Sequence, residues 1–153
     1  MTTVVAVSDS HAASLSGLPR ALRDALEAAD LIIHAGDHTE STVLDELKTL
    51  GNVVAVAGNM DSIALKVSLP ARQLFTVEGR TIGVTHGSGA PRGIQQRVRA
   101  LFPENPDVII YGHSHVPYTG TVNDSLMVNP GPAASSYAAV TIGDDVTARI
   151  VHL

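Results

Sequence analysis

The sequence contains no cysteine, which excludes disulfide bonds and thiolate metal sites. Aromatic residues make up only 3% of the chain and charged residues 16%, whereas 44% of the residues are hydrophobic. No hydrophobic run reaches the roughly 18 residues of a transmembrane helix. This composition is typical of a folded globular protein. With 153 residues, the chain has the size of one domain, which we expect to span residues 1–153.

Charged residues are few and their balance is mildly acidic, with a formal net charge of −5. The basic residues are scattered and form no stripe with interleaved aromatics, so we expect no general nucleic-acid binding. Met1 to Asp9 contain no basic segment and run directly into a strand-like pattern, so we expect no secretory signal. We therefore expect a cytoplasmic protein without a membrane partner. A homodimer is an open expectation, since symmetric pairs are common.

The first half of the chain alternates strand-like and helix-like segments. Short hydrophobic runs at Val4–Val7, Leu31–Ala35 and Val53–Ala57 predict buried parallel strands. Leu18–Ala29 and Ser41–Leu50 have hydrophobic residues at the three- and four-residue spacing of one helix face. A βαβαβ order implies right-handed crossovers and a parallel sheet.

The second half is richer in strands than in helices. A short helix is predicted at Gly93–Leu101. The predicted strands, several of them paired as hairpins, are Gln73–Val77, Thr81–Thr85, Val108–Tyr111, Tyr118–Val122, Leu126–Asn129, Tyr137–Ile142 and Val146–Val151. We therefore predict an α/β fold of mixed α+β type, in which two packed mixed sheets are flanked by helices.

Polar side chains that can bind metals follow five of the predicted strands. These candidates are Asp9, His11, Asp37, Asn59, His86, His113 and His115. The carboxyl ends of strands in an open α/β sheet are where ligands bind, so the five strand ends can converge on one place. Asp9 and His11 are two residues apart, as are His113 and His115, and in extended chain this spacing puts both side chains on one side.

A set of aspartate, histidine and asparagine ligands without cysteine suits Mn²⁺, Fe²⁺, Ni²⁺ or Zn²⁺, and we expect Mn²⁺ first. Seven ligands are too many for one tetrahedral ion, but they suit two divalent ions that share a bridging carboxylate. Two such ions about 3.5–4 Å apart can activate a bridging hydroxide and stabilise both oxygens of an in-line phosphoryl displacement. The pattern therefore predicts a dinuclear centre for phosphoester hydrolysis.

These motifs, taken in order along the chain, resemble the calcineurin-like metallophosphoesterase superfamily. The motifs are Asp9-x-His11, Gly36-Asp37, Gly58-Asn59, His86-Gly87 and Gly112-His113-x-His115. Asn129-Pro130-Gly131 and the short chain resemble the small bacterial and archaeal phosphodiesterase branch. The resemblance covers nearly the whole chain, and it implies a four-layer αββα sandwich that hydrolyses a small phosphodiester.

The resemblance also implies a role for each candidate residue. Asp9, His11 and His115 would hold one metal, and Asn59, His86 and His113 the other, with Asp37 bridging. Asp37, His113 and Asn59 would act in catalysis through a metal-bound hydroxide, and Asn59 would also contact the substrate. The loop at Asn129-Pro130-Gly131 would support the site.

Two positions depart from the family pattern. Met60 stands where many superfamily phosphatases have a histidine that binds phosphate or protonates the leaving group, and Ser88 replaces a second histidine of the small branch. Neither departure affects the metal ligands, but both argue against efficient hydrolysis of alkyl phosphates with poor leaving groups. We therefore expect diesters with good leaving groups to be the best substrates. Two alternatives stay open: a small phosphomonoesterase, and a protein-interaction scaffold like the retromer subunit of this family.

Other polar residues near the motifs have roles that are structural or open. His34 lies inside a strand and is expected to be a hydrogen-bonded core residue. His38 and Arg92 are candidates for substrate contact, although an exposed position without such a role is equally open for each. Asp61 is expected to cap a turn or helix, with a hydrogen-bond acceptor behind a metal ligand as the alternative. His152 is expected to be incidental.

Overall fold

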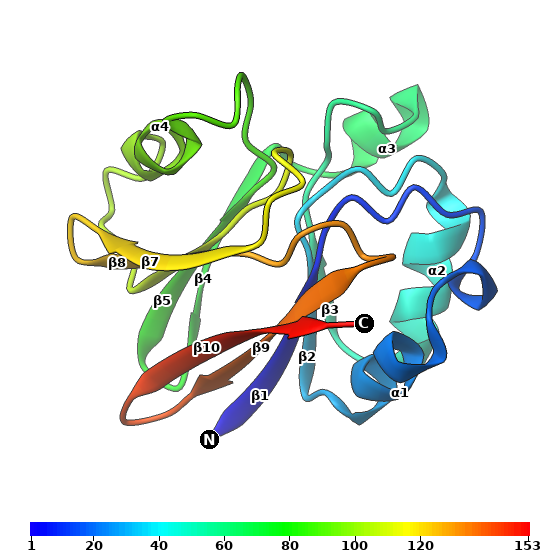
Figure 1. Cartoon of the computed structure of the whole chain (residues 1–153), viewed down its shortest axis with the longest axis horizontal. Coiled ribbons are helices and arrows are strands. Elements are labelled where there is room, and N and C mark those ends of the chain that lie inside the picture. The colour runs from blue at the N-terminus through cyan, green and yellow to red at the C-terminus, as the bar shows by residue number, and fades with distance from the viewer.

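The computed structural model describes residues 1–153 and contains two five-stranded sheets packed face to face (Figure 1). In the first sheet the strand order is β10-β9-β1-β2-β3. Its strands are β1 (Thr2–Val7), β2 (Leu31–His34), β3 (Val53–Ala55), β9 (Ser136–Ile142) and β10 (Val146–His152). β1, β2 and β3 run parallel, and β9 pairs antiparallel with both β1 and β10.

The second sheet has the order β4-β5-β6-β8-β7 and is also mixed. Its strands are β4 (Arg72–Val77), β5 (Arg80–Thr85), β6 (Val108–Ile110), β7 (Tyr118–Val122) and β8 (Ser125–Asn129). β5, β6 and β8 run parallel, whereas β4 and β7 are antiparallel edge strands. β6 is completely buried, as its uninterrupted hydrophobic sequence predicts.

Helices cover the outer faces of both sheets. They are α1 (Arg20–Ala28), α2 (Ser41–Leu50), α3 (Ile63–Ser68) and α4 (Ile94–Ala100), with a short 3₁₀ turn at Leu15–Gly17. α1 and α2 pack on the first sheet, where Leu22 and Leu26 of α1 contact the outward side chains of β1 and β2. α4 packs on the outer face of the second sheet through Ile94 and Val98. No helix is both long and apolar enough to reach across a lipid bilayer.

The main core lies between the two sheets. Its fully buried members come from both sheets and include Val4, Ile33, Val84, Ile110 and Val140. The residues of β9 alternate strictly between buried and half-buried positions, as expected for a strand with one face in the core. The resulting layers are helix, sheet, sheet and helix (Figure 1).

The predicted fold of two mixed sheets flanked by helices is confirmed, and so is every predicted strand and helix to within a few residues. The prediction omitted α3, which has only six residues. Ile63 and Val67 of α3 are each 82% exposed, so the helix lacks the buried stripe that makes a helix visible in sequence. Ser62 was the available signal, since its hydroxyl caps the helix by accepting a hydrogen bond from the Leu65 amide.

Candidate metal centre

The seven predicted ligands lie together at one end of the two sheets. The parallel strands β1, β2, β3, β5 and β6 all point their carboxyl ends toward this end, so the loops that follow them meet there. The distances that link the seven side chains run from 3.0 to 3.8 Å. Residues more than one hundred positions apart in sequence are therefore neighbours.

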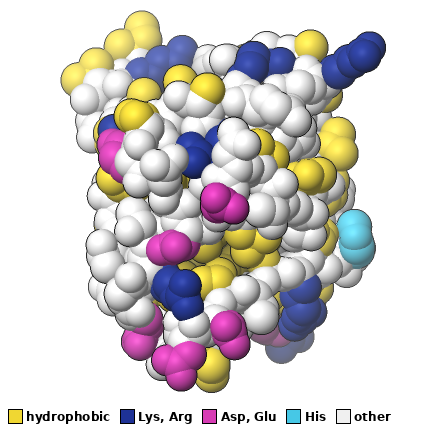
Figure 2. Space-filling view, turned by 90° about the vertical axis from the view of Figure 1, so that its left-hand side faces the viewer, with side chains coloured by type: hydrophobic (Ala, Val, Ile, Leu, Met, Phe, Trp, Pro, Cys, Tyr) yellow, Lys and Arg dark blue, Asp and Glu magenta, His cyan; other side chains and the backbone are white.

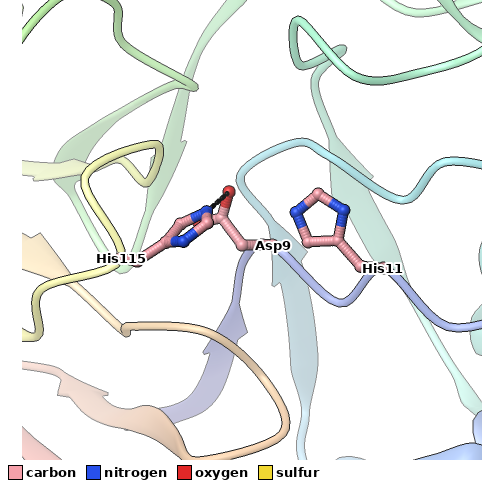
Figure 3. Close-up of side chains that lie close together, drawn as sticks. All are labelled: Asp9, His11 and His115. Carbon is pink, nitrogen blue, oxygen red and sulfur yellow. Dashed lines mark ion pairs between the residues drawn. The ribbon is translucent and has the colours of Figure 1, made fainter.

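Asp9 lies at the centre of the first group of candidate ligands (Figure 3). Its Oδ1 lies 3.4 Å from Nε2 of His115, and the ring of His11 lies on the opposite side of the carboxylate. The two histidine rings face each other edge-on, with 5.8 Å between their centroids. The three side chains can direct ligand atoms at one small volume, as a mononuclear metal position requires.

Asp37 and His86 form the centre of the second group. Oδ2 of Asp37 lies 3.2 Å from Nε2 of His86 and 3.7 Å from Nε2 of His11. Asp37 therefore lies between the two groups, as the predicted bridge requires. Asp9 also belongs to both groups, because its Oδ1 is 3.8 Å from Nε2 of His86. Which carboxylate bridges stays a prediction.

Asn59 connects His86 to His113. Its Oδ1 lies 3.0 Å from Nε2 of His86 and 3.3 Å from Nδ1 of His113. Nε2 of His113 is 3.0 Å from the carbonyl oxygen of Gly89, which can only accept a hydrogen bond. The proton of a neutral His113 ring therefore lies on Nε2, and Nδ1 presents its lone pair toward Asn59.

Oxygen atoms of three other candidate ligands gather around Nε2 of His86. Nδ1 of His86 donates to the carbonyl of Ala35 at 2.8 Å, so Nε2 of the neutral ring is an acceptor facing the oxygens of Asn59 and Asp37. Oδ1 of Asp9 is buried and has no hydrogen-bond partner. Acceptors that converge in this way fit a bound cation, since unpaired buried polar atoms are costly.

Electrostatics of the same atoms favour positive charge. Burial alone would raise the pKa of Asp37, but the hydrogen bond from the protonated His86 ring and the one from the Met60 amide outweigh it and lower this pKa to about 2. Burial alone would lower the pKa of His86, but its hydrogen bond with Asp37 and the charges of Asp37 and Asp9 raise it. The carboxylate of Asp37 thus stays ionised and favours positive charge beside it, on His86 or on a metal ion.

The backbone of the candidate ligands is strained. Asp9, His11, Asp37, His113 and His115 all adopt left-handed conformations, with φ between 44° and 71°. Such conformations are uncommon for residues other than glycine, and they concentrate at functional sites. They turn each ligand side chain away from its strand direction and toward the centre of the site.

Two glycines let the ligand loops approach each other. A Cβ atom at Gly58 would collide with the backbone nitrogen and Oδ1 of Asp37. A Cβ atom at Gly112 would collide with the hydroxyl of Ser8, the residue that donates a 2.7 Å hydrogen bond to Oδ2 of Asp9. Only glycine fits at these positions without moving a candidate ligand.

Asp61 holds two ligand loops together from behind the site. This buried carboxylate accepts hydrogen bonds from three backbone amides: Thr39 at 2.7 Å, Gly58 at 2.7 Å and Asp37 at 3.2 Å. The expected structural role of Asp61 agrees with these contacts. Sequence reasoning missed that it joins the Asp37 loop to the Asn59 loop, because the three amides come from segments far apart in sequence.

His34 and His38 are both completely buried beneath the site. Their rings stack with 3.6 Å between centroids, and His34 bonds to the Ser10 hydroxyl and the Gly36 amide, as expected for a core histidine. Nε2 of His38 bonds to the carbonyl of Val56. With no exposed surface, His38 has no face for a substrate, so the predicted substrate contact is corrected to a packing role.

Asn129 and Ser8 support the ligand loops, whereas Arg92 stays at the surface. Nδ2 of Asn129 donates to the carbonyl of Gly112 and to the Ser114 hydroxyl, which agrees with the expected supporting role. Ser8 was missed, although its place directly before Asp9 was the available signal. Arg92 lies on the exposed loop after β5, and its contact with substrate stays a prediction.

Comparison with known proteins gives one consistent family. The calcineurin-like phosphoesterase superfamily domain matches residues 2–147. A probable metallophosphoesterase of Methanocaldococcus jannaschii is 36% identical over 156 residues, covering 96% of this chain and 79% of that protein. A phosphodiesterase of the same organism is 26% identical, covering 76% of each protein. The solution structure of a Thermotoga maritima protein has 32% identity, complete coverage of both chains and a TM-score of 0.79.

Proposed function

Because this chain belongs to the calcineurin-like phosphoesterase superfamily, we propose that it is a metal-dependent phosphodiesterase that uses two divalent cations. The observation that carries the proposal is that oxygens of Asn59, Asp37 and Asp9 lie 3.0, 3.2 and 3.8 Å from Nε2 of His86, and that the buried Asp9 oxygen has no hydrogen-bond partner. The similarity to an archaeal phosphodiesterase supports a diester as substrate.

We assign the ligands of the two ions as the motifs imply. Asp9, His11 and His115 hold one ion, Asn59, His86 and His113 hold the other, and Asp37 contributes to both. Mn²⁺ suits this donor set, and Fe²⁺, Ni²⁺ and Zn²⁺ are alternatives. When bound, such ions stabilise the charge that develops on the phosphate and lower the pKa of water, so that a nucleophile forms near neutral pH.

The chain orients these ligands through its backbone. The Ala35 carbonyl fixes the proton of His86 on Nδ1 and leaves Nε2 free to bind. The Met60 amide donates to Oδ1 of Asp37 at 2.8 Å, which leaves Oδ2 to face His11 and His86. The ligand atoms are thus positioned before a substrate arrives.

The surroundings of the site favour an accessible phosphodiester. The side chain of His115 is 53% exposed and Met60 is 60% exposed, so both ester groups of a diester can extend into solvent. On the face in Figure 2, Lys and Arg side chains lie along the upper end, whereas most Asp and Glu side chains lie in the middle and lower parts. Met60 cannot donate a proton, so substrates with good leaving groups react best.

Removal of metal tests the function directly. We expect that stripping with a chelator abolishes hydrolysis of an aryl phosphodiester, that Mn²⁺ restores it, and that His113→Ala lowers the restored rate about 100-fold, because this imidazole is a ligand. The measurement is kcat/KM with and without Mn²⁺, and His152→Ala, at an exposed position, is the control. Mn²⁺ binding without turnover of any diester would favour the scaffold function instead.

Met60→His tests the proposed substrate preference. A histidine here can protonate a poor leaving group, a step that contributes roughly 10²–10⁴-fold in enzymes that use it. We therefore expect Met60→His to raise kcat/KM for an alkyl monoester more than for an aryl diester, with Met60→Leu as control. If the wild-type protein had an equal or higher kcat/KM for the alkyl monoester than for the aryl diester, it would instead be a phosphomonoesterase.

A further inference from the structure

The loop after β5 folds around the guanidinium group of Arg97, a residue of α4. Nε and Nη2 of Arg97 donate to the carbonyl of Ser88 at 3.2 and 2.9 Å, and Nη1 donates to the carbonyl of Arg92 at 2.9 Å. Nη2 also donates to the carbonyl of Ala90. One charged group thus bonds to three carbonyls of a five-residue stretch, and hydrogen bonds from charged donors are the stronger ones.

Gly89 lies inside this stretch and is shaped by the same guanidinium group. Its φ of 79° is left-handed, and a Cβ atom there would lie 3.1 Å from Nη2 of Arg97. The carbonyl of Gly89 points the other way, toward the metal centre, where it accepts the proton of His113 Nε2 at 3.0 Å. The position of Arg97 therefore determines where this carbonyl lies.

We propose that Arg97 is a positioning residue for the metal ligand His113 and acts through the carbonyl of Gly89. The carbonyl keeps the His113 proton on Nε2, so Nδ1 keeps its lone pair and faces Oδ1 of Asn59 at 3.3 Å. Without the guanidinium group the 88–92 stretch loses its hydrogen bonds to α4. The ring of His113 then turns, or carries its proton on either nitrogen, and it binds the metal less well.

The exposure of Arg97 separates this role from a role in folding. Arg97 lies on the outer surface of α4, whereas Ile94 and Val98 anchor the helix in the core. Replacement of Arg97 therefore leaves the packed face of the helix unchanged. The role concerns the ion held by Asn59, His86 and His113, and it leaves the Asp9, His11 and His115 group intact. It rests on the proposed two-metal function.

The test compares Arg97→Gln and Arg97→Lys with wild type by calorimetric titration of the metal-free protein with Mn²⁺. We expect one of two binding events to weaken roughly 10- to 100-fold while the other keeps its affinity. Lysine keeps the charge but lacks the planar fork that spaces the donors of Arg97 across the carbonyls of Ser88, Ala90 and Arg92, so we expect it to resemble glutamine. Arg20→Gln is the control, because Arg20 is exposed on α1 and pairs with Asp24, away from the 88–92 stretch.

A second measurement reads the position of the proton without metal. Nitrogen NMR of the metal-free protein is expected to show the Nε2–H form of His113 in wild type and a mixture of both forms in Arg97→Gln. Gly89→Ala, which displaces the same contact from the other side, is expected to give the same mixture. Melting temperatures of the metal-free Arg97 variants are expected to equal that of wild type, whereas Gly89→Ala is expected to melt at a lower temperature because alanine is strained at a φ of 79°.

The role of Arg97 and the two-metal function can fail separately, and three outcomes tell these failures apart. Two binding events of wild-type affinity together with an unchanged His113 proton would overturn the role of Arg97 alone. Equal weakening of both events with a lower melting temperature would also overturn it, because it would indicate a folding defect. A wild-type protein that binds no Mn²⁺ would overturn the two-metal function, and the NMR comparison would still decide the role of Arg97.

Discussion

Asp37→Asn is expected to lower kcat/KM for an aryl phosphodiester by about 100-fold or more, the upper end of what loss of a ligand-supporting group costs. Oδ2 of Asp37 faces His86 at 3.2 Å and His11 at 3.7 Å, so its charge serves both ligand groups. Asparagine keeps the shape but removes the charge. Mn²⁺ stoichiometry, measured by calorimetry on the same sample, is expected to fall below that of wild type.

Asp24→Asn is the matched control for this change, because Asp24 is exposed on α1 and far from the site. It is expected to leave both the rate and the stoichiometry unchanged. If Asp37→Asn still bound two Mn²⁺ ions per chain, Asp37 would not be the bridge. Asp9, which also faces ligands of both groups, would then be the next residue to test by the same substitution.

Asp61→Ala is expected to destabilise the protein by about 3 kcal/mol or more. The substitution leaves the amides of Asp37, Thr39 and Gly58 without their acceptor, and each unsatisfied buried donor costs about 1–3 kcal/mol. The free energy of unfolding is measured by urea denaturation of metal-free protein. It is expected to fall while the dependence on urea concentration stays the same.

Asp45→Ala is the control for stability, since Asp45 is exposed on α2 and its loss should have little effect. Asp61→Asn keeps one side-chain oxygen, so we expect an intermediate loss. A variant Asp61→Ala as stable as wild type would mean that water replaces the carboxylate. In that case the two ligand loops would not depend on Asp61 for their connection.

Much of the fold could be predicted from local patterns because burial and periodicity agree in most elements. α2 begins and ends at the predicted residues, since Gly51 stops the helix directly after its last hydrophobic residue. β3 was predicted to reach Ala57 but ends at Ala55, because the Ala57 amide bonds to Pro70 and the chain leaves the sheet there. That bond joins distant segments, and no local pattern reports it.

The candidate ligands could be found from sequence because each follows a hydrophobic strand, but their supporting contacts could not. His38 is completely buried, with its ring stacked on that of His34 and its Nε2 bonded to the carbonyl of Val56. The bonds from Arg97 to the loop before it depend on left-handed glycines, whose conformations are fixed only in the folded chain. Long-range geometry therefore decides which polar residues serve the site.

The left-handed backbone at five candidate ligands has a consequence for ion selectivity. Each such conformation costs on the order of 1–3 kcal/mol, and the surrounding fold supplies this energy when the chain folds. The backbone therefore holds these side chains toward one place before an ion enters, which favours a cage of one size. A cage of this kind discriminates by radius and coordination geometry, so Ca²⁺, which prefers a larger and more flexible shell of oxygens, is expected to compete poorly with Mn²⁺.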